Sequence, residues 1–457
     1  MPSILDEIVA NRKRHLDGIR DRVGHVSFAT LPKSERSLYD ALTAPGASYI
    51  MECKSASPSL GTIRADYRPG EIASVYSRYA SAISVLCEPD YFGGDYDHLA
   101  TVAATTHLPV LCKDFIVDEV QLYAARYFGA DAVLLMLSVL SDAEYAHLAA
   151  VADSLDMDVL TEVIDEDEAA RATRLGARIF GVNHRNLSDL SIDLSRSARL
   201  AALAPEGAAV VAESGIRDAA TVRRLGAHAD AFLVGSQLTS QPDVDRACRE
   251  LVYGPNKVCG LRSAAAAQAA KAAGAVYGGL IFEEASPRNV SRETAAAIIA
   301  AEPGLDYVAV SRRASGYGEL VQPGVSAVQV HAPYQGSLDA ERELIELVRS
   351  EVGGGAEVWR AVDMTGPAAE VAGEVAELVD TLVLDAGAGG TGEAFDWSRV
   401  GTTKALLAGG LNPGNLEEAL RVGCLGLDLN SGFEDPRGHK DAAALRRGFA
   451  TIRNFHT

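Results

Sequence analysis

The sequence predicts an α/β protein made of two tandem (β/α)8 barrels, and three observations lead to this fold class. Its 457 residues exceed the size at which one hydrophobic core stops growing, so two domains are expected. Apolar, strand-like runs alternate with helical stretches rich in Ala, Leu, Arg and Glu. Eight such runs occur in each half, which has the size of one barrel. A series of doubly wound sheets is the rival architecture, but no G-x-G-x-x-G motif opens a helix.

The first half begins with an amphipathic leader, residues 3–20, whose apolar side chains recur at helical spacing. Helices are predicted between most of the strands, for example at 120–128 and 166–175. Gly129, Gly176 and Gly226 precede alanine at helix ends, where we expect glycine to form left-handed caps. The strands of this half are predicted at residues 48–54, 82–87, 109–113, 132–137, 158–162, 179–183, 209–213 and 231–235.

The cycle restarts at Asn256. A helix predicted at 243–252 is followed by the helix breakers Gly254 and Pro255. The predicted domains are therefore residues 1–255 and 256–457. The strands of the second half are predicted at residues 257–260, 276–282, 307–311, 327–331, 358–362, 381–385, 405–409 and 426–430.

Charge, cysteine content and hydropathy argue against several classes of partner. The formal net charge of −20 disfavours nucleic acid and requires any phosphate site to be built locally, from backbone N–H groups and a few cations. The six cysteines include no C-x-x-C pair, which is typical of reduced thiols in the cytoplasm. No signal peptide and no apolar run of membrane-spanning length is present. We therefore expect a soluble cytoplasmic protein.

Polar side chains close nearly every strand of the first half. Glu52 and Lys54 stand two positions apart, so the alternation of a strand places both on one face. The carboxyl ends of parallel strands meet at one rim of a barrel, where active sites form. We expect acid–base chemistry at this rim, with structural ion pairs as the alternative. The other residues at these strand ends are Lys113, Glu162, Asn183, Arg185 and Glu213.

Small residues after the last two strands of this half predict a phosphate site. Ser214 and Gly215 follow one strand, and Gly235 and Ser236 close the next. Such residues expose backbone N–H groups to an anion. Ser57, beyond the first strand, adds a hydroxyl.

Residues 1–255 resemble the indole-3-glycerol-phosphate synthase family in a series of motifs: Glu52-Cys-Lys-Ser-Ala-Ser-Pro-Ser59, Leu111-Cys-Lys-Asp-Phe115, Leu160-Thr-Glu-Val163, Gly181-Val-Asn-His-Arg-Asn-Leu187, Ala212-Glu-Ser-Gly215 and Val234-Gly-Ser236. The resemblance implies closure of an indole ring on carboxyphenylamino-deoxyribulose phosphate, with loss of CO2 and water and without a cofactor or metal. It implies Lys113 as the general acid on the ketone oxygen, assisted by Lys54. Glu162 would be the general base, and Glu52 would hold substrate and lysine.

The same resemblance assigns substrate contacts. Asn183 and Arg185 would position the anthranilate end, Glu213 and Ser214 would line the site, and the phosphate would bind to Ser57, Gly215, Gly235 and Ser236. A lysine works best as an acid when its pKa is lowered, and Lys54 is a candidate to lower that of Lys113. Leu60 stands where the family commonly has a basic residue, so we expect weaker phosphate or loop contacts there.

A cysteine and an aspartate mark the second half. Cys259 closes its first strand, where a buried structural thiol is the alternative. Asp385 follows three apolar residues and precedes the glycine-rich run 386–392. That run lacks the Gly-Lys-Ser/Thr ending of a Walker loop.

Residues from 256 to about 455 resemble the phosphoribosylanthranilate isomerase family, through Cys259, Asp385 and the motifs Gly279-Leu-Ile-Phe282, Ser286-Pro-Arg288, Val328-Gln-Val-His331, Phe395-Asp-Trp397, Ala408-Gly-Gly-Leu411 and Leu429-Asn-Ser-Gly432. The resemblance implies a cofactor-free Amadori rearrangement, with Asp385 as acid on the furanose oxygen and Cys259 as base at C2. Arg288 would hold the anthranilate carboxylate. The phosphate would bind to Gly409, Gly410, Asn430 and Ser431. Departures lie in loops, such as Arg262 onward, and lead us to expect altered substrate affinity before altered chemistry.

The two resemblances fit together, because the product of the implied isomerase is the substrate of the implied synthase. The expected ligands are phosphorylated anthranilate–sugar compounds, and a chain with two complete sites works as a monomer. Two alternatives stay open: another phosphosugar isomerase or Schiff-base aldolase pair, and a fusion whose second barrel has decayed to a binding or scaffold role.

Overall fold

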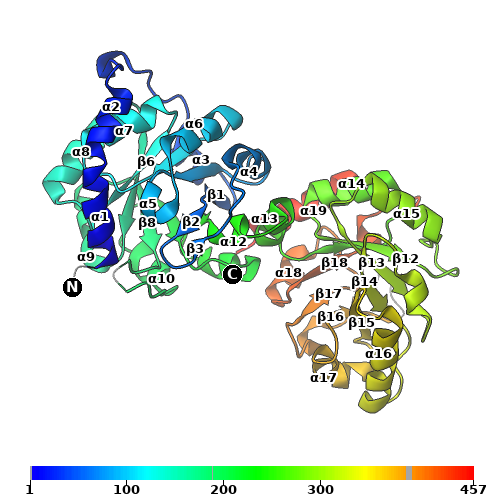
Figure 1. Ribbon diagram of the computed structural model, residues 1–457. Helices are drawn as coiled ribbons and strands as arrows, with labels where there is room; N and C mark the ends of the chain where they lie inside the picture. The colour runs from blue at the N-terminus through cyan, green and yellow to red at the C-terminus, as the bar shows by residue number, and fades with distance from the viewer. Residues whose placement is uncertain (1–2, 188, 388–393, 457) are drawn as a thin grey trace. The chain divides into compact units, whose positions relative to one another are not determined.

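The computed structural model describes residues 3–187, 189–387 and 394–456, and the chain divides into two compact units. One unit contains the chain up to Cys248 together with His456, and the other is Arg249–Phe455. In each unit, parallel strands form a closed barrel with helices around it (Figure 1). The predicted fold class is confirmed. Of the glycine-rich run predicted after Asp385, residues 388–392 fall outside the described residues.

In the first barrel, the described strands close in the order β1-β10-β9-β8-β7-β6-β5-β4, all parallel. The strands are β1 (Ser48–Cys53), β4 (Ala82–Leu86), β5 (Val110–Lys113), β6 (Ala132–Met136), β7 (Asp158–Val163), β8 (Ile179–Asn183), β9 (Ala209–Glu213) and β10 (Ala231–Val234). A short antiparallel hairpin, β2 (Ala56–Ser57) and β3 (Gly61–Thr62), lies in the loop after β1.

The helices of this unit begin with the leader, which divides into α1 (Ile4–Arg14) and α2 (Leu16–Val23). Ser3 caps α1, and the Asp6 carboxylate accepts from the Ser3 backbone N–H in return, a capping box that fixes where the helix starts. The remaining helices are η1 (Phe28–Thr30), α3 (Leu38–Thr43), α4 (Pro69–Tyr76), α5 (Pro89–Phe92), α6 (Tyr96–Thr105), α7 (Glu119–Tyr127), α8 (Asp142–Ser154), α9 (Glu166–Arg174), α10 (Arg196–Ala201), α11 (Ala219–Leu225), α12 (Ser236–Thr239) and α13 (Val244–Tyr253), whose residues from Arg249 on belong to the second unit.

The expected glycine caps are found at two of three positions. Gly129 and Gly176 have φ values of 102° and 78°, in the left-handed region. The prediction was wrong for Gly226, whose φ of −61° is right-handed helical. A Cβ there would lie 2.0 Å from His456 Nδ1, so close packing of a side chain, and not backbone conformation, accounts for this glycine.

In the second barrel, the described strands close in sequence order from β11 to β18, all parallel. The strands are β11 (Lys257–Val258), β12 (Tyr277–Ile281), β13 (Asp306–Ser311), β14 (Val325–Val330), β15 (Glu357–Asp363), β16 (Thr381–Asp385), β17 (Ala405–Leu407) and β18 (Gly426–Leu429). The helices are α14 (Ala264–Ala273), α15 (Arg292–Ala301), η2 (Tyr317–Leu320), α16 (Leu338–Val352), η3 (Pro367–Val371), α17 (Ala372–Ala376), η4 (Trp397–Arg399), α18 (Leu416–Arg421), η5 (Ser431–Phe433) and α19 (Ala442–Asn454).

The interior of the second barrel is a packed apolar plug. Trp359 on β15 is fully buried, and its ring meets that of Tyr277 edge-on at 4.8 Å. Val308, Val383 and Leu406, from three further strands, pack in the same cluster. The barrel is therefore filled, and ligand space is left at a rim.

No helix in the described ranges is both long and apolar enough to cross a membrane.

Candidate active sites

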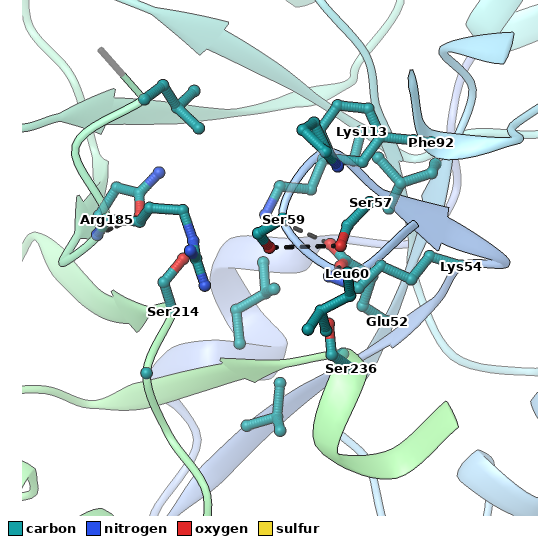
Figure 2. A pocket seen from close by; sticks show the side chains of 18 of the residues that line it. Glu52, Lys54, Ser57, Ser59, Leu60, Phe92, Lys113, Arg185, Ser214 and Ser236 are labelled. Carbon is teal, nitrogen blue, oxygen red and sulfur yellow. Dashed lines mark hydrogen bonds and ion pairs between the residues drawn. The ribbon is translucent and has the colours of Figure 1, made fainter. Parts of the chain in front are cut away.

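The first barrel contains a cavity of about 510 Å³ at the carboxyl ends of its strands. Figure 2 shows Arg185 and Ser214 on one side of this cavity and Glu52, Lys54 and Lys113 on the opposite side. Almost every residue predicted for this site lines it: Glu52, Lys54, Ser57, Lys113, Glu162, Asn183, Arg185, Ser214, Gly215, Gly235 and Ser236. The remaining one, Glu213, is fully buried and reaches the site through Lys113.

A network of ion pairs connects the predicted acid and its neighbours. Lys113 Nζ lies 2.9 Å from Glu213 Oε2 and 3.3 Å from Glu52 Oε2. The other oxygen of Glu52 lies 2.8 Å from Lys54 Nζ. These three contacts join β1, β5 and β9, so the two lysines are held in the cavity wall by carboxylates that are themselves out of solvent.

The charges in this network decide its protonation. Burial by itself would raise the pKa of Glu52, but the ammonium groups of Lys113 and Lys54 outweigh burial and lower that pKa to about 2. Burial likewise disfavours the Lys113 ammonium, but the carboxylates of Glu213, Glu52 and Glu162 outweigh it and raise the pKa of Lys113. The expected lowering of the Lys113 pKa by Lys54 was therefore wrong for this state of the site. Carboxylates, and not the second lysine, dominate the surroundings of Lys113.

Glu162, at the end of β7, has the opposite protonation behaviour. Its Oε1 accepts a hydrogen bond of 3.1 Å from Asn183 Nδ2, on the next strand. Burial and the negative charge of Glu213 raise the pKa of Glu162 to about 8. A carboxyl group with a pKa near neutrality both accepts and returns a proton readily, as a general base must.

The residues that follow β9 and β10 also line the cavity. Ser214 and Gly215, after β9, both have left-handed φ values of 68° and 78°, which is uncommon for serine. Gly235, after β10, packs so closely that a Cβ would lie 2.5 Å from Glu52 Oε1 and 3.0 Å from Lys54 Nζ. A side chain at position 235 would therefore displace Glu52 or Lys54, and α12 begins at the next residue.

The loop after β1 is joined by hydrogen bonds to the segment that follows β10. Arg64 donates from Nη1 to the carbonyl oxygens of Thr239 and Gln241, at 3.1 and 2.9 Å. Ser57 Oγ lies 3.5 Å from Ser59 Oγ, and both line the cavity. Leu60, which stands where the synthase family commonly has a basic residue, also lines the cavity and is 62% exposed.

Sequence reasoning missed several residues of this site. The apolar lining of Phe92, Phe115 and Leu134 offers a surface for an aromatic ring. Arg217 also lines the cavity. The pKa of Arg185 is lowered mainly by burial and, to a smaller extent, by the positive charge of Arg217. A signal for Arg217 was available, because it lies just beyond the Ser214-Gly215 turn, whereas the aromatic residues carry no local mark.

The second barrel has its own cavity of about 310 Å³, also at the carboxyl ends of the strands. Cys259 and Asp385, predicted as base and acid, both line it. The other predicted residues line the same cavity: Arg288, Gly409, Gly410, Asn430 and Ser431.

Asp385 closes β16 and is nearly out of solvent. Burial raises its pKa to about 7, although the backbone N–H of Ala386 donates to Oδ1 at 2.8 Å and favours the anion. His331 Nε2 lies 3.7 Å from Asp385 Oδ2. Burial and nearby cations lower the pKa of His331 to about 3, so the imidazole is neutral beside a carboxyl group that is partly protonated at pH 7.

Arg288 is held in a bidentate ion pair. Its Nε and Nη2 donate to the two oxygens of Glu434 at 2.8 and 2.9 Å. Lys440 Nζ donates to Glu434 Oε1 at 2.7 Å and to Asn430 Oδ1 at 2.9 Å. Sequence reasoning named Arg288 and Asn430 but missed Glu434 and Lys440, which lie in the loop after β18.

Lys257 is a further residue that sequence reasoning missed. It lies on β11, fully buried, and its Nζ donates to Gln329 Oε1 and to Asp428 Oδ2, both at 2.7 Å. It stands two positions before Cys259, so strand alternation was a signal that both side chains share a face.

Known protein families match both halves of the chain. Residues 5–251 match the family described as indole-3-glycerol phosphate synthase, and residues 256–450 match that of N-(5'-phosphoribosyl)anthranilate (PRA) isomerase. The tryptophan biosynthesis protein TrpCF of Corynebacterium glutamicum is 66% identical over 468 residues, covering 100% of this chain and 99% of the relative. The TrpCF protein of Salmonella typhi is 43% identical, covering 100% of each. The chain belongs to the bifunctional TrpCF family.

It is a tryptophan-biosynthesis enzyme with an N-terminal lyase domain, the indole-3-glycerol phosphate synthase, and a C-terminal isomerase domain, the PRA isomerase. Both family resemblances drawn from the sequence are confirmed. Among solved structures, the phosphoribosyl anthranilate isomerase of Thermus thermophilus is 31% identical, with a TM-score of 0.37. That comparison covers 43% of this chain and 97% of the other.

Proposed function

We propose that the second barrel isomerises N-(5-phosphoribosyl)anthranilate and that the first barrel closes the indole ring on the product. The observation that carries this proposal is the gathering of an acid and a base in each cavity: Lys113 with Glu162, and Asp385 with Cys259. Each pair comes from strands far apart in the sequence.

In the isomerase cavity, protonated Asp385 gives its proton to the furanose ring oxygen, and the C–O bond opens to a Schiff base. The Cys259 thiolate then removes the proton from C2, and the resulting enolamine becomes the aminoketose when a proton returns to C1 and one leaves the C2 hydroxyl. The pKa of Asp385, near 7, supports its role as an acid that regains its proton each turnover.

In the synthase cavity, Lys113 donates a proton to the ketone oxygen while the anthranilate ring carbon attacks the carbonyl carbon. Loss of CO2 restores the ring. The hydroxyl group then takes a proton from Lys54 and leaves as water, and Glu162 removes a proton from the neighbouring ring carbon. The ionised Glu52 holds Lys113 and Lys54 in position. The high pKa of Lys113 keeps it charged before catalysis, so the proton to be donated is present at neutral pH.

Substrate binding uses the cations and backbone groups around each cavity. Asn183 and Arg185 position the anthranilate end in the first site, and Ser214 lines it. Arg288 holds the anthranilate carboxylate in the second site and shares its guanidinium with Glu434. The phosphate groups bind to Ser57, Gly215, Gly235 and Ser236 in the first barrel and to Gly409, Gly410, Asn430 and Ser431 in the second.

We also propose that the functional domains are residues 1–255 and 256–457, that the chain works as a cytoplasmic monomer, and that phosphorylated anthranilate–sugar compounds are its ligands. All six cysteines, each described by the structure, are buried and free, which supports a reducing compartment.

Two single substitutions test this assignment. Lys113→Ala should abolish formation of indole-glycerol phosphate and leave isomerisation intact, and Asp385→Ala should do the reverse. Anthranilate fluorescence after addition of the aminoaldose reports isomerisation, and indole absorbance after addition of the aminoketose reports ring closure, so that each readout depends on one barrel. Lys33→Ala and Glu377→Ala, at exposed ion pairs, are matched controls that should change neither. Loss of both activities in Asp385→Ala would overturn the division of labour.

The alternatives give different results in the same experiment. If the isomerase barrel had decayed, the wild-type chain would leave the aminoaldose unconsumed yet still convert the aminoketose. If a Schiff-base aldolase operated through Lys54 or Lys113, borohydride with substrate would inactivate the first barrel and leave a stable adduct.

A further inference from the structure

Lys257 is a charged side chain in a fully buried position, where a charge is unfavourable. It has no exposed surface and projects from β11 beside the apolar plug of the second barrel. Removing an ammonium group from water is strongly unfavourable unless close partners compensate for the lost hydration. Two oxygens, of Gln329 and Asp428, each lie 2.7 Å from its Nζ and provide that compensation.

The lysine and the catalytic thiol pack over the same glycine. A Cβ at Gly279 would lie 2.6 Å from Cys259 Sγ and 3.0 Å from Lys257 Cε, so these two groups are neighbours above β12. An ammonium group has three N–H donors. Gln329 and Asp428 accept from two of them, and the sulfur of Cys259 lies beside the end of the same side chain.

We propose that Lys257 is a positioning residue whose ammonium group favours the thiolate form of Cys259 in the isomerase site, while Gln329 and Asp428 fix the ammonium group in place. The inference rests on the proposed role of Cys259 as the base. A charged neighbour is needed because only the thiolate takes a proton from carbon, and a thiol buried among apolar groups is otherwise inert.

The surroundings of the thiol support this role. Burial raises the pKa of Cys259, and the positive charge of Lys257 is the largest influence in the opposite direction. Asp428 raises that pKa further and Lys440 lowers it. The other titratable groups that line the same cavity are Glu283, Arg288, Arg312, His331 and Asp385.

Lys257 does not itself exchange the proton. Its carboxylate and thiol neighbours outweigh burial and raise its pKa, so it stays charged when Cys259 takes the proton from C2. One S–H bond forms and one C–H bond breaks, and the charge lost from sulfur is gained by the substrate. Asp428 keeps the lysine from moving during this step, since its Oδ2 remains paired.

The test measures the ionisation of the thiol directly. The thiolate absorbs near 240 nm, and subtracting the titration of Cys259→Ser isolates the contribution of Cys259 in the full-length chain. Lys257→Met should raise the midpoint by about one pH unit or more, because an opposite charge close by favours the ionised form by that amount. Isomerase kcat/KM at pH 7 should fall about tenfold or more and partly recover at higher pH.

A second variant protects the test against misfolding. Lys257→Met leaves Asp428 buried without its partner, which is destabilising, whereas Lys257→Met/Asp428→Asn removes both charges. The double variant should also titrate at higher pH than the wild type, because Lys257 influences Cys259 more strongly than Asp428 does. Synthase activity of the same chain serves as the control for the first barrel.

A midpoint that stays within experimental error of the wild type, in whichever variant keeps the wild-type near-UV circular dichroism, overturns the inference. That outcome is distinct from failure of the proposed function, in which the unmodified chain would not isomerise the aminoaldose at all.

Discussion

The protonation of Glu162 depends on a second carboxylate, and Glu213→Gln tests this dependence. Gln has nearly the shape of Glu but carries no charge, and its side-chain oxygen can still accept from Lys113, as Glu213 Oε2 does at 2.9 Å. Removing a negative charge near Glu162 favours its ionised form, so the pKa of Glu162 should fall from about 8.

The size of the shift follows from the strand geometry. Gly181 on β8 pairs in register with Glu162, and a Cβ at Gly181 would lie 2.2 Å from Glu213 Oε1. The two carboxyl groups are thus separated by little more than one strand spacing, about 6 Å. Two unit charges at ~6 Å repel by about 2.8 kcal/mol at an effective dielectric constant of about 20, which corresponds to about 2 pKa units. Lys113 stands beside both carboxylates and offsets part of this repulsion, so we expect a shift of about 1 to 2 units.

The assay is the pH dependence of synthase kcat/KM, whose acidic limb reports the general base of the free enzyme. In Glu213→Gln this limb should move to lower pH by about 1 to 2 units. Glu168→Gln is the matched control, because Glu168 is the weakest of the named influences on Glu162 and its removal should shift the limb much less. An acidic limb that stays in place or moves to higher pH in Glu213→Gln would refute this account of the site.

Three further predictions concern the first barrel. Glu162→Gln should stabilise the first barrel at pH 8.5 but not at pH 4. The pKa of Glu162 in the folded protein, about 8, lies above its value in the unfolded chain, so the wild type loses stability as the pH rises from the unfolded to the folded pKa. This loss in the free energy of unfolding is on the order of 3–5 kcal/mol. Urea unfolding followed by far-UV circular dichroism measures this, with tryptophan fluorescence, which arises from the second barrel alone, as the internal reference. Gly235→Ala should lower synthase kcat/KM about tenfold or more by displacing Glu52 and Lys54, whereas Gly18→Ala, where an added Cβ meets nothing, should leave it unchanged. Leu60→Arg should lower the synthase KM several-fold at low salt, and an unchanged KM, or an equal gain in Leu60→Gln, would contradict an electrostatic cause.

Much of the site could be read from the chain because the fold converts sequence periodicity into position. Glu52, Lys113 and Glu162 each follow an apolar run, and parallel strands in a closed barrel bring such positions to one rim. The same logic placed Cys259 and Asp385 on one cavity.

Other features could not be read in this way, because they depend on distances between residues that are remote in sequence. Arg288 meets Glu434 across 146 positions, and Lys257 meets Asp428 across 171. The pKa of Lys113 was expected to fall and is instead raised, since the sign depends on how many carboxylates lie nearby in space. Gly226 looked like the other helix-ending glycines, but a side chain from the far end of the chain explains it.

By itself, then, the sequence determined the two barrels, the residues at their rims and the families to which each half belongs, because these follow from local periodicity and from short motifs. The tertiary structure alone decided the electrostatics: which carboxylate is ionised, which lysine partners which acid, and which charges are withdrawn from water. Burial and through-space separation set those energies, and both arise only once the strands have closed.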